Sequence, residues 1–221
     1  MPAKADDASV RRRRAALLTF AVFWLITCVK APAGLYLVAQ HTPTVLAFAA
    51  AWWLVTRRRM DGLSLGCWLL FWTAHCIGAR WIYSYVPYDE ALRALFGQDT
   101  GDWFGWRRNH YDRLVHFLYG VCATPPMVVL HRRWGRRSAS AAVLAVEFVL
   151  ASSALYELAE WGAAVVMAPD WADSYLGQQG DIWDAQKGMA LAGAGSAFVA
   201  AVSVLTPRLF TLDGPKVSAG P

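Results

Sequence analysis

The residues most able to do chemistry are acids and one histidine that lie within or beside long apolar runs. A charged side chain is costly inside a bilayer, so it usually faces the interior of a helix bundle and marks a functional position. Three short motifs in the C-terminal half carry such residues. Together they supply the six candidate catalytic side chains: Asp112, His116, Glu157, Glu160, Asp181 and Asp184.

The first motif is residues 109–117, at the start of an apolar run. Asp112 and His116 are four residues apart, so they share one face of a helix. Asp112 falls in the first turn, where the helix dipole favours an anion. A structural role is equally open, with Asp112 capping the helix and His116 bonding to a neighbouring span.

The second and third motifs each carry two acids three residues apart. Glu157 and Glu160 share a helix face about 27 Å from the start of their run, at ~1.5 Å per residue, which places them near one surface of the bilayer. Glu160 could simply reach interfacial water. Asp181 and Asp184 precede the last apolar run, where N-capping and the helix dipole explain one acid more easily than two.

Carboxylates with a histidine suit more than one chemistry. They can bind a divalent cation such as Mg²⁺, Ca²⁺ or Mn²⁺, and the candidate metal ligands are Asp112, His116, Glu157, Asp181 and Asp184. They equally suit general acid–base work, because crowded carboxylates push their pKa values apart. A structural alternative has Arg113 or His116 neutralising the acids. The spacing alone does not decide between cation binding, acid–base catalysis and a structural role.

The elements that position these motifs are apolar helices. The chain has 221 residues, of which 57% are hydrophobic and only 17% charged, below the about 25% charged residues of an ordinary soluble domain. We therefore predict an all-α, polytopic membrane helix bundle with six transmembrane helices. The apolar runs are 15–29, 43–56, 63–80, 114–130, 139–168 and 186–206.

The basic residues predict the orientation of this bundle. Most of the 21 Lys and Arg lie in the N-terminal tail, in the loops after the second and fourth runs, and in the C-terminal tail. The positive-inside rule then gives N-in and C-in, in a bacterial inner membrane. The net charge of +5 is therefore read as orientation in a lipid bilayer and not as binding to nucleic acid.

This topology predicts the domain organisation. Residues 1–14 form a basic cytoplasmic tail, 15–206 one six-span domain, and 207–221 a disordered cytoplasmic tail. Disorder is also expected for residues 1–10. The long outer loop 81–113 is rich in aromatics, which predicts an interfacial helix at 88–97. All three motifs then lie at one depth, facing the exterior.

Two further features concern packing. Gly188, Ala192 and Ser196 recur at intervals of four in the last run, a small-residue stripe that lets helices approach closely. The four cysteines each lie within an apolar run with no CxxC pair, which indicates buried small hydrophobes and not a zinc site or a disulfide framework.

At these motifs the chain resembles the YjdF-like bacterial inner-membrane proteins, a family of uncharacterised function. The resemblance rests on residues 75–80 with Tyr83 and Pro87, and on 105–117, 156–161 and 176–186. The sequence departs from that family's pattern at Gly188, where the pattern has an Asp. A weaker resemblance to VanZ-like membrane proteins covers only the last three spans and implies an envelope substrate.

Three functions follow from these patterns. The first is an enzyme or binding protein for a lipid or cell-envelope ligand at the outer membrane surface, with or without a divalent cation. The second is a transporter of a small solute or proton, using Glu147 deeper in the fifth run. The third is a non-catalytic structural protein whose polar groups lock the bundle. The sequence does not specify an oligomeric state.

Overall fold

A computed structural model describes residues 2–32, 34–166 and 178–210 of the chain. Within these ranges the protein forms eight α-helices and one short 3-10 helix, and no strand. The predicted all-helical class is confirmed. The helices are α1 (Pro2–Cys28), α2 (Gly34–Thr56), α3 (Gly62–Arg80), α4 (Tyr88–Phe96), α5 (Thr100–Phe104), α6 (Tyr111–Arg133), α7 (Ser138–Val166) and α9 (Asp184–Leu205), followed by η1 (Pro207–Phe210).

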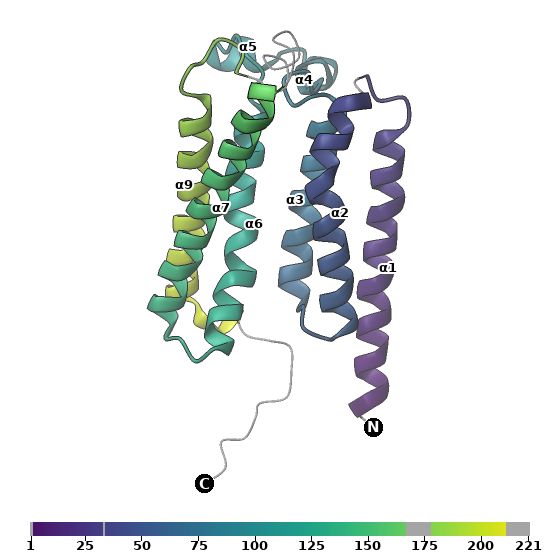
Figure 1. The fold of residues 1–221 in the computed structure, drawn as a ribbon, viewed down its shortest axis with the longest axis vertical. Helices are drawn as coiled ribbons and strands as arrows, with labels where there is room; N and C mark the ends of the chain where they lie inside the picture. Colours follow the sequence, from purple (N-terminus) through teal and green to yellow (C-terminus); the bar gives the residue numbers. More distant parts are fainter. Residues whose placement is uncertain (1, 33, 167–177, 211–221) are drawn as a thin grey trace.

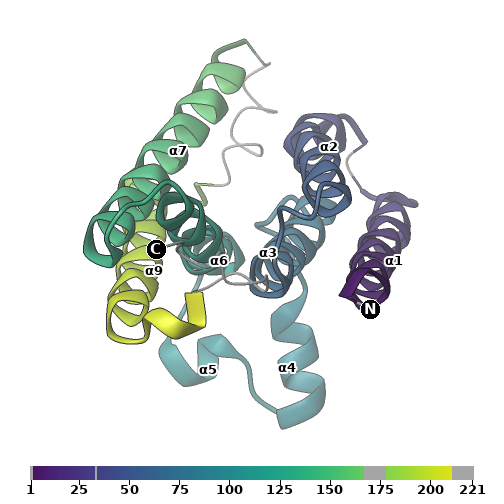
Figure 2. The ribbon, with the colours of Figure 1, turned by 90° about the horizontal axis from the view of Figure 1, so that it is seen from below.

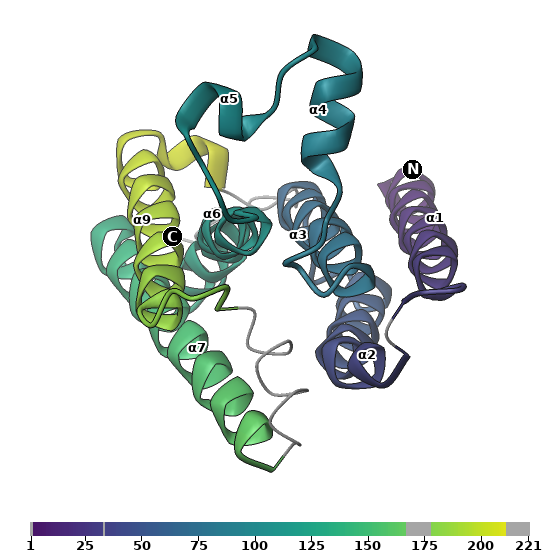
Figure 3. The ribbon, with the colours of Figure 1, turned by 90° about the horizontal axis from the view of Figure 1, so that it is seen from above.

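The long helices stand side by side along one axis in two groups of three (Figure 1). Helices α1, α2 and α3 contact one another, as do α6, α7 and α9. Helices α3 and α6 join the two groups along a central seam, which is seen from below in Figure 2 and from above in Figure 3. The short helices α4 and α5 cross one end of the molecule.

Four of the long helices are long and apolar enough to cross a membrane: α3, α6, α7 and α9. Their surfaces carry many exposed apolar side chains, among them Leu114, Leu155, Leu158 and Phe198. Such exposure is unfavourable in water but natural against lipid chains. Helices α1 and α2 run alongside these four, although length and composition do not mark them as spans (Figure 1).

The small-residue stripe packs α9 against α6. Ala192 and Ser196 are fully buried, and the Ser196 hydroxyl lies 2.6 Å from that of Thr124. On the facing helix, a Cβ added at Gly120 would overlap the backbone carbonyl of Ala192. The close helix approach that this stripe predicts is confirmed.

Local signals fix the ends of several elements. Asp61 precedes α3 and its carboxylate accepts the Ser64 N–H at 2.9 Å. Asp99 and Asp102 form a reciprocal capping box at α5. Gly97, with φ 73°, ends α4 in the left-handed conformation that glycine adopts without strain.

The structure confirms the helix predicted in the outer loop and contradicts part of the disorder predicted for the two tails. The short helix predicted at 88–97 is confirmed by α4. The disorder predicted for residues 1–10 is wrong from Pro2 onward, because α1 already begins there. Disorder from 207 is wrong as far as Phe210, because η1 packs there and Phe210 is buried, whereas 211–221 lie outside the described residues.

Candidate functional site

Five of the six candidate residues line one cavity of about 440 Å³ at the end of the molecule that α4 and α5 cross. Helix α6 contributes Asp112 and His116, α7 contributes Glu157 and Glu160, and α9 contributes Asp184. The pairs on α6 and α7 thus each have both members on the cavity wall, whereas only Asp184 of the pair Asp181 and Asp184 lines it. No lysine or arginine is among the described residues that line the cavity.

His116 lies between two of these acids. Its Nε2 is 3.3 Å from Glu157 Oε1 and 3.6 Å from Asp112 Oδ1. Glu157 Oε1 is buried and has no hydrogen-bond partner among the described residues. The imidazole thus has one carboxylate from α6 and one from α7 close to its Nε2, an arrangement suited to acid–base chemistry.

Gly188 leaves the space that His116 and Glu157 occupy. A Cβ at this position would lie 2.9 Å from the His116 ring and 3.0 Å from Glu157 Oε1. Position 188 therefore faces the two side chains directly. The position at which the sequence is expected to depart from the family pattern thus lies beside the candidate site residues.

Asp181, the sixth candidate, does not line the cavity and lies at its rim. It is bound by Arg113, by Lys187 at 2.7 Å and by Arg108 at 3.4 Å. Its Oδ1 also accepts the Trp183 N–H at 3.1 Å. The hydrogen bond from Lys187, followed by that from Trp183 and the charge of Arg113, lowers the pKa of Asp181 to about 2.

The same two arginines bind Asp184. Arg108 lies 2.8 Å and Arg113 3.5 Å from Asp184 Oδ1, and all three side chains are largely buried. The neutralising role considered for Arg113 is thus present, and it extends to Arg108, which the spacing gave no reason to select. Burial, with the positive charges of Arg113 and Arg108, lowers the pKa of the neighbouring His110.

Helix capping, the ordinary alternative for two of the acids, is not observed. The N-cap residues of α6 and α9 are His110 and Trp183, and neither makes a side-chain capping bond. Asp112 and Asp184 instead occupy the first turns of the two helices, where they face the cavity and the arginines. The helix dipole still favours their negative charge there.

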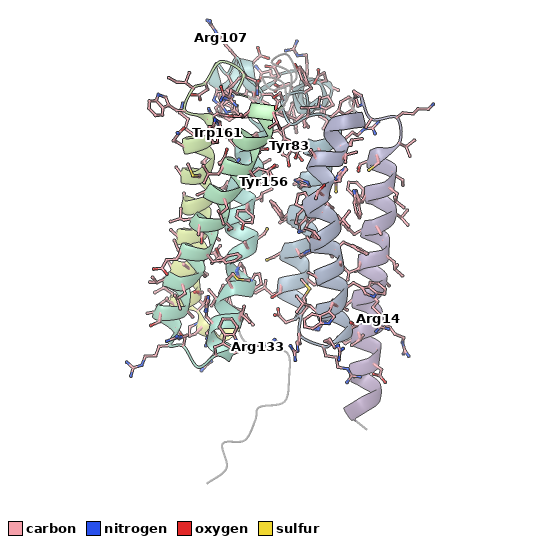
Figure 4. The ribbon with its side chains drawn as sticks, in the orientation of Figure 1. Arg14, Tyr83, Arg107, Arg133, Tyr156 and Trp161 are labelled. Atoms are coloured by element: carbon pink, nitrogen blue, oxygen red, sulfur yellow. The ribbon has the colours of Figure 1, made fainter. Side chains whose placement is uncertain are left out.

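A second, smaller cavity of about 170 Å³ adjoins the first along the seam between the two groups of helices. Tyr83, Asp112 and His116 line both cavities. The remaining lining includes the aromatic side chains of Phe71, Trp72, Tyr119 and Tyr156. In Figure 4, Tyr83 and Tyr156 lie between the two groups, in the upper part of the molecule.

The contacts of Tyr83 were not anticipated from the sequence. Its hydroxyl is 2.5 Å from His75 Nδ1, and His75 Nε2 is 2.9 Å from the backbone oxygen of Gln40. Both residues belong to one stretch of the family resemblance. Nothing in their spacing indicated a role, because Tyr83 lies beyond the end of α3 and its direction depends on the turn there.

Four of the five candidate metal ligands line the cavity, and Asp181 does not. Within the part of the chain that the structure describes, no three His, Cys, Asp or Glu side chains are grouped so that they could hold an ion. Asp181 is instead occupied by basic side chains. Glu147, the candidate for proton transport, is exposed on α7 and lines neither cavity.

Comparison with known proteins identifies the family. Residues 12–208 match the model of a family described as predicted membrane protein (DUF2238). The chain belongs to this family. It is similar to the inner membrane protein YjdF of Escherichia coli (strain K12), at 34% identity over 185 residues, which is 80% of this chain and 82% of the relative.

These matches confirm the YjdF-like resemblance and, with the apolar helices, show a multi-pass protein of the bacterial inner membrane. The VanZ-like resemblance is not supported by them. No solved structure matches the chain.

Proposed function

We propose that this protein binds an amphipathic lipid or cell-envelope substrate at the outer face of the inner membrane, with the polar part of the substrate in the acid-lined cavity. The observation that carries the proposal is the cavity wall, where Asp112, His116, Glu157, Glu160 and Asp184 meet from three helices. Such a concentration of acids at the end of apolar helices is too costly to be explained by packing alone.

The lining of the cavity supports an amphipathic ligand. Leu158, Trp161 and Ile182 line it together with the acids, and their side chains are 60%, 63% and 77% exposed. In a membrane, side chains exposed at this level would contact lipid. A ligand that enters past them can leave its chain in the bilayer while its polar group reaches the acids.

The pair of His116 and Glu157 supports a catalytic role within this proposal. A histidine 3.3 Å from a carboxylate is a common unit for moving a proton to or from a bound group. A step of this kind would transfer a proton between the substrate and His116, with Glu157 stabilising the imidazolium.

The proposal includes the six-span arrangement with both termini in the cytoplasm. Support comes from the end of the molecule opposite the cavity, where the loops after α2 and α6 meet and Arg133 donates to the Arg59 carbonyl at 3.1 Å. Arg14 and Arg133 lie toward this end and Arg107 at the other (Figure 4). On this proposal residues 1–14 are a basic cytoplasmic segment, 15–206 the membrane domain, and 207–221 a second cytoplasmic segment.

A structural role is the second candidate, and the rim of the cavity favours it. Arg108 and Arg113 bind Asp181 and Asp184, so these four residues tie the outer loop to the start of α9. This network explains two of the acids without a ligand. It does not explain Glu157 and Glu160, for which no salt bridge with an arginine is described, although the charges of Arg108 and Arg113 also act on Asp112.

The test compares two glutamates of the same helix. The full chain is purified into nanodiscs of E. coli polar lipid, and the molecules that stay bound are identified by native mass spectrometry. Glu157→Gln should lose a bound amphiphile that the wild type and the control Glu147→Gln both retain. If the wild type retains no amphiphile, or Glu157→Gln retains the same one, the binding proposal fails.

A further inference from the structure

Tyr83 is held against the cavity by its own turn and by a glycine beneath it. Ile82 and Tyr83 both have left-handed backbones, with φ 49° and 50°, a conformation that is costly for residues other than glycine and more so for a β-branched one. The Tyr83 N–H donates to the Gly78 carbonyl at 2.7 Å. A Cβ at Gly78 would lie 2.5 to 2.8 Å from the tyrosine ring, so the ring occupies the space that glycine leaves open.

The hydrogen bonds of His75 fix the direction of the Tyr83 hydroxyl. A carbonyl oxygen only accepts, so the contact with Gln40 requires the His75 proton on Nε2. His75 is buried against the rings of Phe71 and Trp72, and no ion pair joins it to an acid among the described residues. A neutral ring with its proton on Nε2 has an acceptor at Nδ1, and the Tyr83 hydroxyl therefore donates to it.

The hydrogen bond to His75 determines which hydrogen-bonding groups Tyr83 can offer to a ligand in the cavity. With its one proton directed to His75, the phenol oxygen can only accept hydrogen bonds from a ligand. Burial, then the charges of Asp112 and Glu160, raise the pKa of Tyr83 well above its usual value, so the phenol stays neutral. The carboxyl groups of Asp112, Glu157 and Glu160 also line the cavity, and each keeps an oxygen that can accept a hydrogen bond whether or not the group is ionised.

We propose that Tyr83 contacts the ligand and accepts a hydrogen bond from it, so that the site selects a polar group with N–H or O–H donors, an amine or a hydroxyl, over a phosphate. This inference rests on the proposed function and deepens it by naming the class of polar group. A phosphate is disfavoured because it brings mainly acceptors and negative charge at neutral pH, and four acids already line the cavity.

The test uses three amphiphiles that differ only in the polar group: dodecylamine, dodecanol and dodecyl phosphate. Binding to the full chain in nanodiscs is measured by tryptophan fluorescence, since Trp161 lines the cavity. Dodecylamine and dodecanol should bind saturably and compete with each other, whereas dodecyl phosphate should bind at least tenfold more weakly. The relative affinities of the first two distinguish an amine from a hydroxyl group as the natural ligand.

Two variants test the role of Tyr83. Tyr83→Phe should weaken dodecylamine binding about tenfold, the scale of one hydrogen bond to a charged group. The control Tyr119→Phe removes a phenol hydroxyl that lines only the smaller cavity, and it should bind as the wild type does. His75→Leu removes the acceptor of the Tyr83 hydroxyl, so this hydroxyl becomes free to donate to a ligand. The difference in affinity between dodecanol and dodecyl phosphate should therefore become smaller. A purely structural role of Tyr83 would not produce this change.

The outcomes separate this inference from the proposed function. Phosphate binding as tight as amine binding, or no change in Tyr83→Phe while Glu157→Gln abolishes binding, would overturn the role of Tyr83 and leave the amphiphile site standing. If none of the three amphiphiles binds the wild type, the amphiphile site is itself refuted. Folding of each variant is checked by circular dichroism and gel filtration.

Discussion

At the scale of single residues, the two sets of acids behave differently. Asp181 and Asp184 are neutralised by Arg108 of the outer loop and Arg113 of α6, whereas the described salt-bridge partner of Glu157 is His116. A carboxylate with a compensating arginine stabilises the fold, and its removal leaves a buried arginine unpaired. Glu157 does not compensate the charge of an arginine in a described salt bridge, so its substitution should affect ligand binding more than folding.

Asp181 gives a pH dependence whose sign follows from its lowered pKa. Between the ordinary aspartate pKa of 3.8 and the folded-state pKa of about 2, Asp181 binds fewer protons in the folded state than in the unfolded state. The stabilisation by Asp181 is therefore fully present above about pH 4 and is lost as the pH falls from there toward 2.

The measurement is thermal unfolding in detergent for the wild type and Asp181→Asn. Asp181→Asn should have the lower midpoint at pH 6, and the gap between the two proteins should close as the pH falls from 4 toward 2. A gap that stays constant across this range would show that the ionised carboxylate contributes nothing to stability.

Position 188 yields a second prediction at this scale. Gly188→Ala places a methyl group against His116 and Glu157 Oε1, at about 3 Å, so these side chains must shift. Amphiphile binding in the nanodisc assay should fall by roughly tenfold, because the acceptor geometry of the site changes. Gly162→Ala, at a position of α7 where no described atom lies within 4 Å of the added Cβ, is the control and should bind normally. Unchanged binding in Gly188→Ala would argue that His116 and Glu157 do not contact the ligand.

At the scale of elements, the sequence predicted the helices better than it predicted the contacts between them. Apolar runs gave the existence of every long helix, and the spacing of Asp112 and His116, or of Glu157 and Glu160, gave the face that each pair shares. Arg108 and Tyr83 could not be found in this way. Each lies in an irregular segment, where side-chain direction depends on turns that carry no periodicity.

The packing of α6 against α9 depends on Gly120. A Cβ there would overlap the Ala192 carbonyl and come within 2.8 Å of the Ser196 nitrogen, both backbone atoms that cannot move aside alone. Gly120→Ala should therefore destabilise the protein by about 1–3 kcal/mol, the usual cost of overpacking.

A matched control makes this result specific. Gly66→Ala introduces the same methyl group in α3, where nothing lies within 4 Å of the new atom. Its thermal midpoint in detergent should stay close to that of the wild type. Equal midpoints for Gly120→Ala and the wild type would mean that α6 and α9 pack less closely than described.

At the scale of the whole molecule, the two groups of helices meet where the chemistry is. Tyr83 and His75 come from the α1–α3 side of the seam, and His116 and Glu157 from the α6–α9 side. A site built across such a seam needs both groups in place. The composition alone indicated a bundle, but it could not indicate that the polar groups gather where the bundle divides.

The orientation in the membrane decides whether this site meets the envelope or the cytoplasm. The cavity lies at the end that α4 and α5 cross, while the arginine-rich loops after α2 and α6 lie at the other. Because cytoplasmic loops carry the excess of Lys and Arg, the cavity should open to the exterior.

Cysteine labelling in spheroplasts tests this directly. In a variant without the four native cysteines, Arg107→Cys at the cavity end should react with a membrane-impermeant maleimide in intact spheroplasts. Arg136→Cys, in the exposed turn after α6, should react only after lysis. The reverse pattern would place the acid cavity on the cytoplasmic side, and an envelope substrate would then have no route to His116 and Glu157.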